Sequence, residues 1–176
     1  KNFEGTVNYV SHFEHIDYSK GSWMLMTRTN KMLEQLKDFF EDKGYYYGSK
    51  KGNNLVNKDI LQAIDTWRKL NEGQLVSAKL AQKMYGFMTV KSGNLKRNFG
   101  KGDSFKSIIE DVINIEDLRN EHGLLATSSW EQALDKINEK KRNFIVAMEK
   151  NKEDISPTVE PRIKLSTIHG AKGDER

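Results

Sequence analysis

The chain has 176 residues, of which 36% are hydrophobic and 31% charged, and its 3 Trp, 6 Tyr and 8 Phe supply bulky side chains for a packed core. The absence of Cys excludes disulfides and thiolate zinc sites and fits a reducing compartment such as the cytoplasm, and the longest apolar run, Trp23–Met26, is too short to span a bilayer. A formal charge of +4 is compatible with a nucleic-acid partner but does not identify one.

The first 48 residues have the pattern of a parallel α/β unit. Thr6–Val10 alternates polar and apolar residues and predicts a half-buried strand, whereas the continuous apolar run Trp23–Met26 predicts a strand covered on both faces. A helix is expected to begin at the N-cap Asn30 and to end at Gly44, and Tyr45–Tyr47 predicts a third, short strand.

The middle of the chain is mainly helical. Asn57 and Ser77 are predicted caps of two helices, a basic loop follows from 91 to 102, and short helical turns are expected at 107–112 and 115–122. A further helix should begin near 127–129, and a last one lies near 144–148. The apolar stripes of the first three full helices are Ile60, Leu61, Ile64, Trp67 and Leu70, then Leu80, Ala81, Met84, Tyr85 and Met88, then Trp130, Ala133, Leu134 and Ile137.

The C-terminal segment returns to strand character at Ile163–Ile168 and then enters a Gly-punctuated polar loop. A lone strand cannot bury itself, so we expect it to rejoin the opening sheet, with the helical middle as an insertion. The predicted parts are residues 1–48, 49–157 and 158–176. The pattern stops where a further helix or strand should follow, which predicts a truncated sheet domain.

The strongest motif is the stretch from Arg162 to Glu175, Arg-Ile-Lys-Leu-Ser-Thr-Ile-His-Gly-Ala-Lys-Gly-Asp-Glu. It resembles motif V of the UvrD/Rep family of superfamily 1 DNA helicases, in which an apolar strand precedes Thr-Ile/Leu-His, two small or polar residues, and Lys-Gly-x-Glu. Asp174 departs from the apolar residue that many members carry. A strand end that delivers polar groups, with glycines that let backbone approach a ligand, suits a nucleotide-dependent motor.

A second stretch, Trp23-Met24-Leu25-Met26-Thr27-Arg28-Thr29-Asn30 with Gly44-Tyr45-Tyr46-Tyr47, resembles motif IV of the same family. That motif has an Arg at the carboxyl end of an apolar strand, an Asn that opens a helix, and a Gly before the next strand. An Arg in this place can reach phosphates bound on a neighbouring domain, where its planar donors stabilise transferring charge.

The resemblance implies an α/β fold, namely part of the second RecA-like domain (2A), interrupted between the two motifs by a helical 2B-like insertion. It implies that Arg28 is catalytic and contacts the γ-phosphate of ATP, and that Glu175 binds the ribose. Thr167 and His169 would bind the backbone of single-stranded DNA, while Lys172, on the DNA side, and Gly173, on the nucleotide side, would shape the loop and couple the two ligands.

The implied activity is ATP-driven translocation on single-stranded DNA and unwinding of duplex DNA, in repair or replication. The implied cofactor is ATP with Mg²⁺, held mainly by the first RecA-like domain of the same parent chain. No Gly-x-x-x-x-Gly-Lys-[Ser/Thr] motif and no acidic Walker B strand occur here, so the chain alone is expected to be inactive. Two alternatives stay open: a non-catalytic DNA- or protein-docking module derived from a helicase, and the motor part of a helicase–nuclease.

Other polar groups have simpler interpretations. His12 and His15 could form a metal pair, but without an evident third ligand they predict a polar surface turn and no metal site. Two basic clusters could contact duplex phosphates, although solvated surfaces are the default. Trp67 and Trp130 lie at apolar helical positions and are expected in the core. The basic clusters are Lys91, Lys96, Arg97 and Lys101, and Lys140, Lys141 and Arg142.

Overall fold

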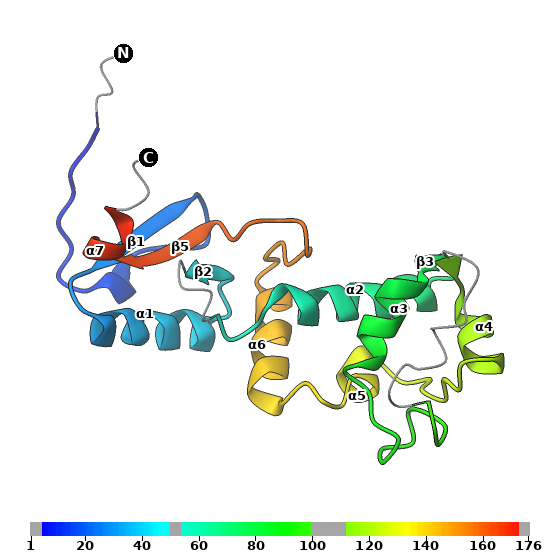
Figure 1. Ribbon diagram of the computed structural model, residues 1–176. Helices are drawn as coiled ribbons and strands as arrows, with labels where there is room; N and C mark the ends of the chain where they lie inside the picture. Colours follow the sequence, from blue (N-terminus) through cyan, green and yellow to red (C-terminus); the bar gives the residue numbers. More distant parts are fainter. Residues whose placement is uncertain (1–4, 50–53, 100–111, 173–176) are drawn as a thin grey trace.

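The computed structural model describes residues 5–49, 54–99 and 112–172 of the chain. Its main sheet has three parallel strands in the order β1–β5–β2, formed by Trp23–Thr27, Ile163–Thr167 and Tyr47–Ser49. Figure 1 shows this sheet towards one end of the molecule, while several of the helices extend away from it. The fold is mixed α/β with a small parallel sheet, which confirms the predicted class at that level.

The last strand of the sequence lies in the middle of the sheet. Ile163 in β5 is opposite both Trp23 in β1 and Tyr47 in β2, in parallel register with each. The prediction that the C-terminal strand rejoins the opening sheet is therefore confirmed. Two parallel strands that are neighbours in a sheet must be joined by a long crossover connection. Between β2 and β5 this connection comprises all the elements that lie between these strands in the sequence.

One face of the sheet is covered by helix α1, Asn30–Lys43. Burial alternates along β1, and Met24 and Met26 are 52% and 55% exposed. The prediction that this strand is covered on both faces is wrong, because Met24 and Met26 remain exposed on one face of β1. The side chains that α1 buries on its apolar side are Leu33, Leu36 and Phe40.

Two strand predictions near the N-terminus also fail. Thr6–Val10 forms no strand and is exposed, with Tyr9 95% accessible, because its alternating pattern meets no partner strand among the described residues. The strand expected at Tyr45–Tyr47 begins only at Tyr47. The amide of Tyr45 still donates to Phe40 O at 2.9 Å, so this residue belongs to the C-terminal cap of α1. Between these segments lies a short 3₁₀ turn, η1, Phe13–His15.

Helices α2, Lys58–Asn71, and α3, Ala78–Tyr85, begin at their predicted caps. The side chains of Asn57 and Ser77 each accept a hydrogen bond from the backbone N–H three residues on, at 3.0 and 3.3 Å respectively. Such caps satisfy amide donors that have no partner within the helix. The predicted apolar stripes of both helices are buried except for Leu80, which is half-buried.

The second sheet was not predicted. Strands β3, Val76–Ser77, and β4, Val112–Ile113, pair antiparallel. The helical turn expected at 107–112 lies outside the described residues except for Val112, which is in β4. The next expected turn is present as α4, Ile115–Asn120, closed by a capping box.

Helix α5, Trp130–Ala133, is one turn long, whereas the apolar pattern predicted a helix through Ile137. The backbone of Leu134 leaves the helical region, and Lys136 N donates to Phe87 O at 3.0 Å instead of continuing the helix. Leu134 and Ile137 are nevertheless buried, as their apolar character predicted. A tertiary hydrogen bond has replaced the helical one.

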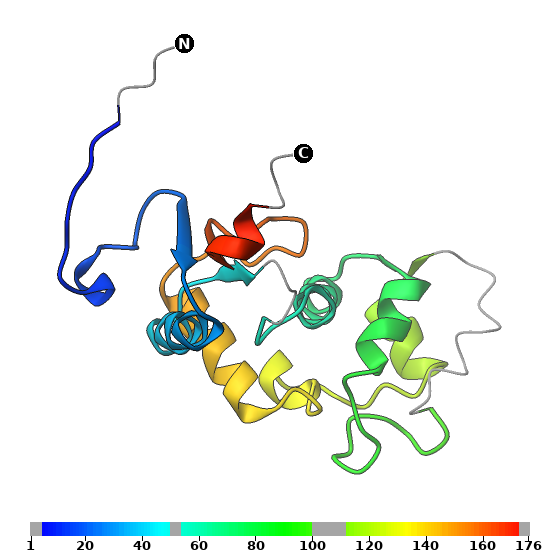
Figure 2. The ribbon, with the colours of Figure 1, turned by 60° about the vertical axis from the view of Figure 1, so that its left-hand side comes forward.

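Helix α6, Glu139–Lys150, crosses between α1 and α2. Both α1 and α2 are seen end-on in Figure 2, with α6 passing between and beneath them. Gly44, in the left-handed conformation at the end of α1, meets the α6 backbone so closely that an added Cβ would lie 2.7 Å from Ala147 C. Asn151 donates from its side chain to Lys43 O at 2.6 Å and to Gly44 O at 2.9 Å.

Buried residues form a single hydrophobic cluster that runs from the sheet through α6 to α2 and α3. Tyr47 in β2 and Phe144 in α6 contribute to it with ring centroids 6.1 Å apart, and an ion pair joins Arg68 of α2 to Glu149 of α6. Helix α6 therefore contacts both the sheet unit and the remaining helices. The boundaries at 48–49 and 157–158 stay predictions.

Candidate functional site

The site begins with the parallel register of β1 and β5. Thr27 and Thr167 are the last paired residues of the two strands and lie opposite each other. Because parallel strands end at the same edge of a sheet, the residues that follow them emerge side by side. We call this surface, made of Arg28, Thr167, His169 and Lys172, the carboxyl edge.

Arg28 follows β1 directly, and the turn that carries it is held by two threonines. The Thr27 hydroxyl is buried and donates to Thr29 O at 3.1 Å. The Thr29 hydroxyl accepts from the backbone of α1 at 3.3 Å, so Thr29 is the N-cap and the predicted cap Asn30 is the first helical residue. Arg28 itself is exposed and makes no ion pair with another described residue.

The turn after β5 presents the second group of side chains. Thr167 is the N-cap of the short helix α7, Ile168–Ala171, and its Oγ accepts from Gly170 N at 3.1 Å. His169 and Lys172 are exposed, and Thr167 is half-buried. Figure 1 shows α7 at the end of β5, on the side of the sheet away from α1.

The carboxyl edge combines two cations, a histidine and a hydroxyl. Arg28 comes from the end of β1, and Lys172 follows α7, which packs against both β1 and β5. Exposed cationic and hydrogen-bonding groups of this kind suit an anionic, oxygen-rich ligand such as a phosphodiester or a nucleotide phosphate. Gly173 and Glu175, the other two predicted nucleotide-binding residues, lie outside the described residues.

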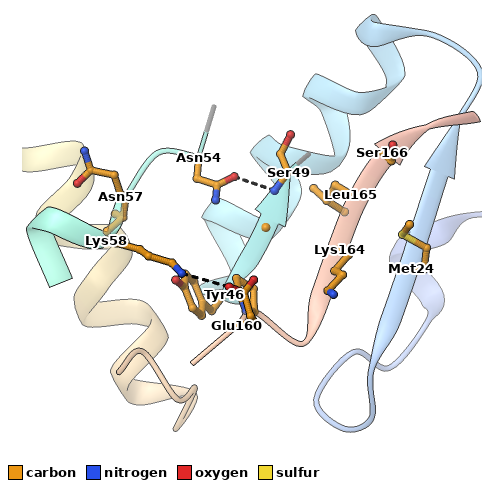
Figure 3. A pocket seen from close by; sticks show the side chains of 13 residues that line it. Met24, Tyr46, Ser49, Asn54, Asn57, Lys58, Glu160, Lys164, Leu165 and Ser166 are labelled. Carbon is orange, nitrogen blue, oxygen red and sulfur yellow. Dashed lines mark hydrogen bonds and ion pairs between the residues drawn. The ribbon is translucent and has the colours of Figure 1, made fainter. Parts of the chain in front are cut away.

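A pocket of about 420 Å³, which the sequence did not predict, lies on the sheet face opposite α1. In Figure 3 Met24, Lys164 and Ser166 lie along the two neighbouring strands, while Lys58 and Glu160 form the rim. The rim is closed by an ion pair of 3.1 Å between Lys58 Nζ and Glu160 Oε1. No sequence pattern signalled this pocket; Gly48 in β2 lines it, and a Cβ added there would lie 3.2 Å from Pro161 Cγ.

The histidine pair lies away from this edge. His12 is the N-cap of η1 and His15 is its last residue; their ring centroids are 5.5 Å apart, and both side chains are exposed. Within the described part of the chain, no group of three or more His, Cys, Asp or Glu side chains is placed to hold a metal ion.

The two basic clusters differ in how far their side chains are bonded to other residues of the fold. Lys91, Lys96 and Arg97 are exposed, and Lys101 lies outside the described residues. In the second cluster, Lys140 pairs with Glu41 at 2.7 Å.

The guanidinium of Arg142, also in the second cluster, donates to Glu131 O and Ile137 O, each at 2.8 Å. Part of that cluster is therefore used within the fold. Trp67 and Trp130 are 3% and 5% exposed, so their predicted place in the core is confirmed.

Comparison with protein-family models, with curated proteins and with solved structures gave no match. Among the described residues, no helix is both long and apolar enough to cross a membrane.

Proposed function

We propose that the chain supplies the motif IV and motif V part of the motor of an ATP-dependent superfamily 1 DNA helicase. In this proposal the sheet with α1 is a portion of the RecA-like 2A domain, and the helices between β2 and β5 are a 2B-like insertion. The partners are single-stranded and duplex DNA and the first RecA-like domain of the same parent chain. That domain would bind most of the ATP and Mg²⁺.

One observation carries the proposal: two stretches that resemble separate motifs of one family emerge at the same sheet edge. Arg28 and the turn Thr167–Lys172 are more than 130 residues apart in sequence, as their numbers show, yet β1 and β5 pair in register up to Thr27 and Thr167. A motor that couples a nucleotide to a DNA strand needs both sets of groups together.

Each residue has a distinct chemical task in this proposal. The planar guanidinium of Arg28 would stabilise negative charge on the γ-phosphate during transfer. Thr167 and His169 would donate hydrogen bonds to the DNA backbone, and Glu175 would accept from the ribose. Lys172 and Gly173 would shape the loop that joins the two ligands, so that closure of the two RecA-like domains on ATP moves the strand.

The decisive experiment is Arg28→Ala in the full-length helicase. The charge of Arg28 matters most in the transition state, so kcat for ATP should fall by about 10³-fold or more, with a much smaller change in KM. The matched control is Lys31→Ala, an exposed cation in the first turn of α1, which should leave kcat unchanged. A normal kcat for ATP in the Arg28→Ala variant would show that Arg28 is a surface cation without a catalytic role.

The alternatives make different predictions for the same parent protein. A non-catalytic docking module would bind DNA or protein without ATP turnover, because no Walker motifs would accompany this chain. A helicase–nuclease would retain DNA-stimulated ATPase activity and also cleave DNA in the presence of a divalent cation. ATPase and nuclease assays on the full-length protein separate these two from the simple helicase.

A further inference from the structure

The turn that follows β5 contains a close contact between two small residues. Ser166 is only 5% exposed, and its hydroxyl donates to Thr167 O at 3.1 Å. A Cβ added to Gly170 would lie 2.9 Å from Ser166 Oγ and 3.1 Å from Thr167 Oγ. These distances are shorter than ordinary carbon–oxygen contacts, so a side chain at position 170 would displace its neighbours.

Backbone conformation does not explain the glycine at this position. Gly170 lies in α7 and is not among the glycines with positive φ, so an alanine backbone could adopt its conformation. The requirement comes from space alone. This separates Gly170 from Gly44, where the left-handed backbone also favours glycine.

We propose that Ser166 and Gly170 are a matched pair of positioning residues that hold the DNA-binding turn closed. Gly170 leaves room for the Ser166 hydroxyl beneath α7, and the Ser166 hydroxyl fixes the carbonyl of Thr167. The pair thereby sets the place of Thr167 and His169 at the carboxyl edge. This inference rests on the proposed function, because it deepens the role of that edge in binding single-stranded DNA.

Hydrogen bonds on both sides of Thr167 support this role. Its carbonyl accepts from Ser166, and its Oγ accepts from Gly170 N at 3.1 Å. The hydroxyl hydrogen of Thr167 is not committed to another described residue. This hydroxyl can therefore donate its hydrogen to a phosphate oxygen, which is an acceptor only, while its oxygen keeps the bond from Gly170 N.

A double-mutant cycle in the full-length helicase tests the pair. Gly170→Ala should weaken binding of a labelled oligothymidylate by about three- to tenfold, the equivalent of one lost neutral hydrogen bond, while the KM for ATP stays unchanged. Ser166→Ala alone should have a smaller effect. The double variant should recover most of the way to the level of Ser166→Ala, because removing the hydroxyl relieves the 2.9 Å contact and leaves only the 3.1 Å contact with Thr167 Oγ.

The matched control is Gly5→Ala, because a Cβ at Gly5 meets no atom within 4 Å and its φ is not positive. Affinities are measured at one salt concentration and well below the unfolding temperature of every variant, so that a general loss of stability does not change them. Normal DNA binding by Gly170→Ala overturns the proposal. A double variant as weak as Gly170→Ala overturns it equally.

A second readout separates this inference from the proposed function. The amide of residue 170 donates to Thr167 Oγ, so its hydrogen exchange in the chain itself reports whether the turn is closed. Gly170→Ala should accelerate this exchange, and the double variant should restore protection. If the wild-type protein does not bind DNA, the proposed function fails, and the exchange data alone decide whether Ser166 and Gly170 form a pair. Unchanged exchange in Gly170→Ala contradicts the pairing.

Discussion

The carboxyl edge and the contact between α1 and α6 belong to the same sheet unit but use their polar groups in opposite ways. At the carboxyl edge Arg28, His169 and Lys172 are exposed. At the α1–α6 contact the amide of Asn151 caps α1, and Glu41, whose side chain is 10% exposed, accepts from Tyr47 at 2.7 Å and pairs with Lys140. The polar side chains of the carboxyl edge are available to a ligand, whereas those of the α1–α6 contact are bonded to other residues of the fold.

This difference indicates which substitutions should affect ligands and which should affect folding. Groups that are exposed and uncommitted contribute little to stability, whereas buried groups that satisfy each other lose much when one partner is removed. Changes at the α1–α6 contact should therefore alter the free energy of unfolding. Changes at the carboxyl edge should alter ligand affinity and lower the free energy of unfolding less.

The largest effect on stability should come from Gly44→Ala. Alanine is strained at the φ of 70° that Gly44 adopts, and its Cβ would also clash with the α6 backbone at 2.7 Å. Together the backbone strain and the overpacking should lower the free energy of unfolding by about 2–4 kcal/mol, measured by urea denaturation.

Gly73→Ala is the matched control for this substitution. Gly73 has a similar φ of 78°, but a Cβ there meets no atom within 4 Å. The control should lose only the backbone part, about 1–2 kcal/mol. Equal losses for the two variants would show that the close approach of α6 to Gly44 adds no penalty of its own.

The proposed function predicts that substitutions at the carboxyl edge of the full-length parent protein separate DNA binding from nucleotide binding. Thr167→Ala combined with His169→Ala should weaken binding of single-stranded DNA and DNA stimulation of ATPase, with nucleotide affinity nearly intact. Glu175→Gln should instead raise the KM for ATP by the equivalent of roughly 1 kcal/mol or more, as expected for one lost charged hydrogen bond. Both affinities are measured for both variants.

A reversed pattern would show that these roles are wrongly assigned even if the family is right. The unfolding free energy of Thr167→Ala with His169→Ala is the internal control. It should fall by no more than about 1–2 kcal/mol, because Thr167 caps only the four-residue helix α7 and His169 is exposed. A larger loss would mean that these side chains serve the fold and not a ligand.

The smallest effect should come from the ion pair between Lys140 and Glu41. The carboxylate of Glu41, first through hydrogen bonding and then through its charge, raises the pKa of Lys140. The pair therefore stabilises the fold at pH values below the ordinary lysine pKa, and this stabilisation is lost as the pH rises through the raised value. Since the lysine side chain is 67% exposed, the contribution should not exceed about 1 kcal/mol.

Lys140→Met compared with Lys150→Met measures this contribution. Both lysines are exposed residues of α6, but Lys150 has no ion-pair partner among the described residues. The stability difference between the two variants should be present at neutral pH, shrink in high salt, and disappear at strongly alkaline pH. A difference that is insensitive to salt and pH would assign the effect to packing of the lysine stem.

Local sequence chemistry was sufficient for several elements. Asn57 and Ser77 cap helices where they were expected, because an Asn or Ser before an apolar stripe satisfies free amides without help from the rest of the fold. The buried stripe of α2 and the burial of Trp67 follow from helical periodicity. The return of β5 to the opening sheet followed from the need of a lone apolar strand for partners.

Errors occurred where a partner elsewhere in the chain decided the outcome. Thr6–Val10 alternates like a strand, but strand formation also needs a neighbouring strand. Helix α5 ends after one turn because Lys136 N bonds to Phe87 O. The prediction that both faces of β1 are covered was wrong because the flexible side chain of Met occurs on exposed as well as on buried faces of a strand.

For the site, the sequence alone determined which residue types are available: an Arg after one apolar strand, and a Thr, His and Lys after another. Motif resemblance assigned them tasks, but a linear pattern carries no distances. Only the tertiary structure decided that the ends of β1 and β5 meet at Thr27 and Thr167, and that Ser166 leaves no room for a side chain at Gly170. Strand register and packing space depend on atoms distant in sequence, so they are settled only when the chain folds.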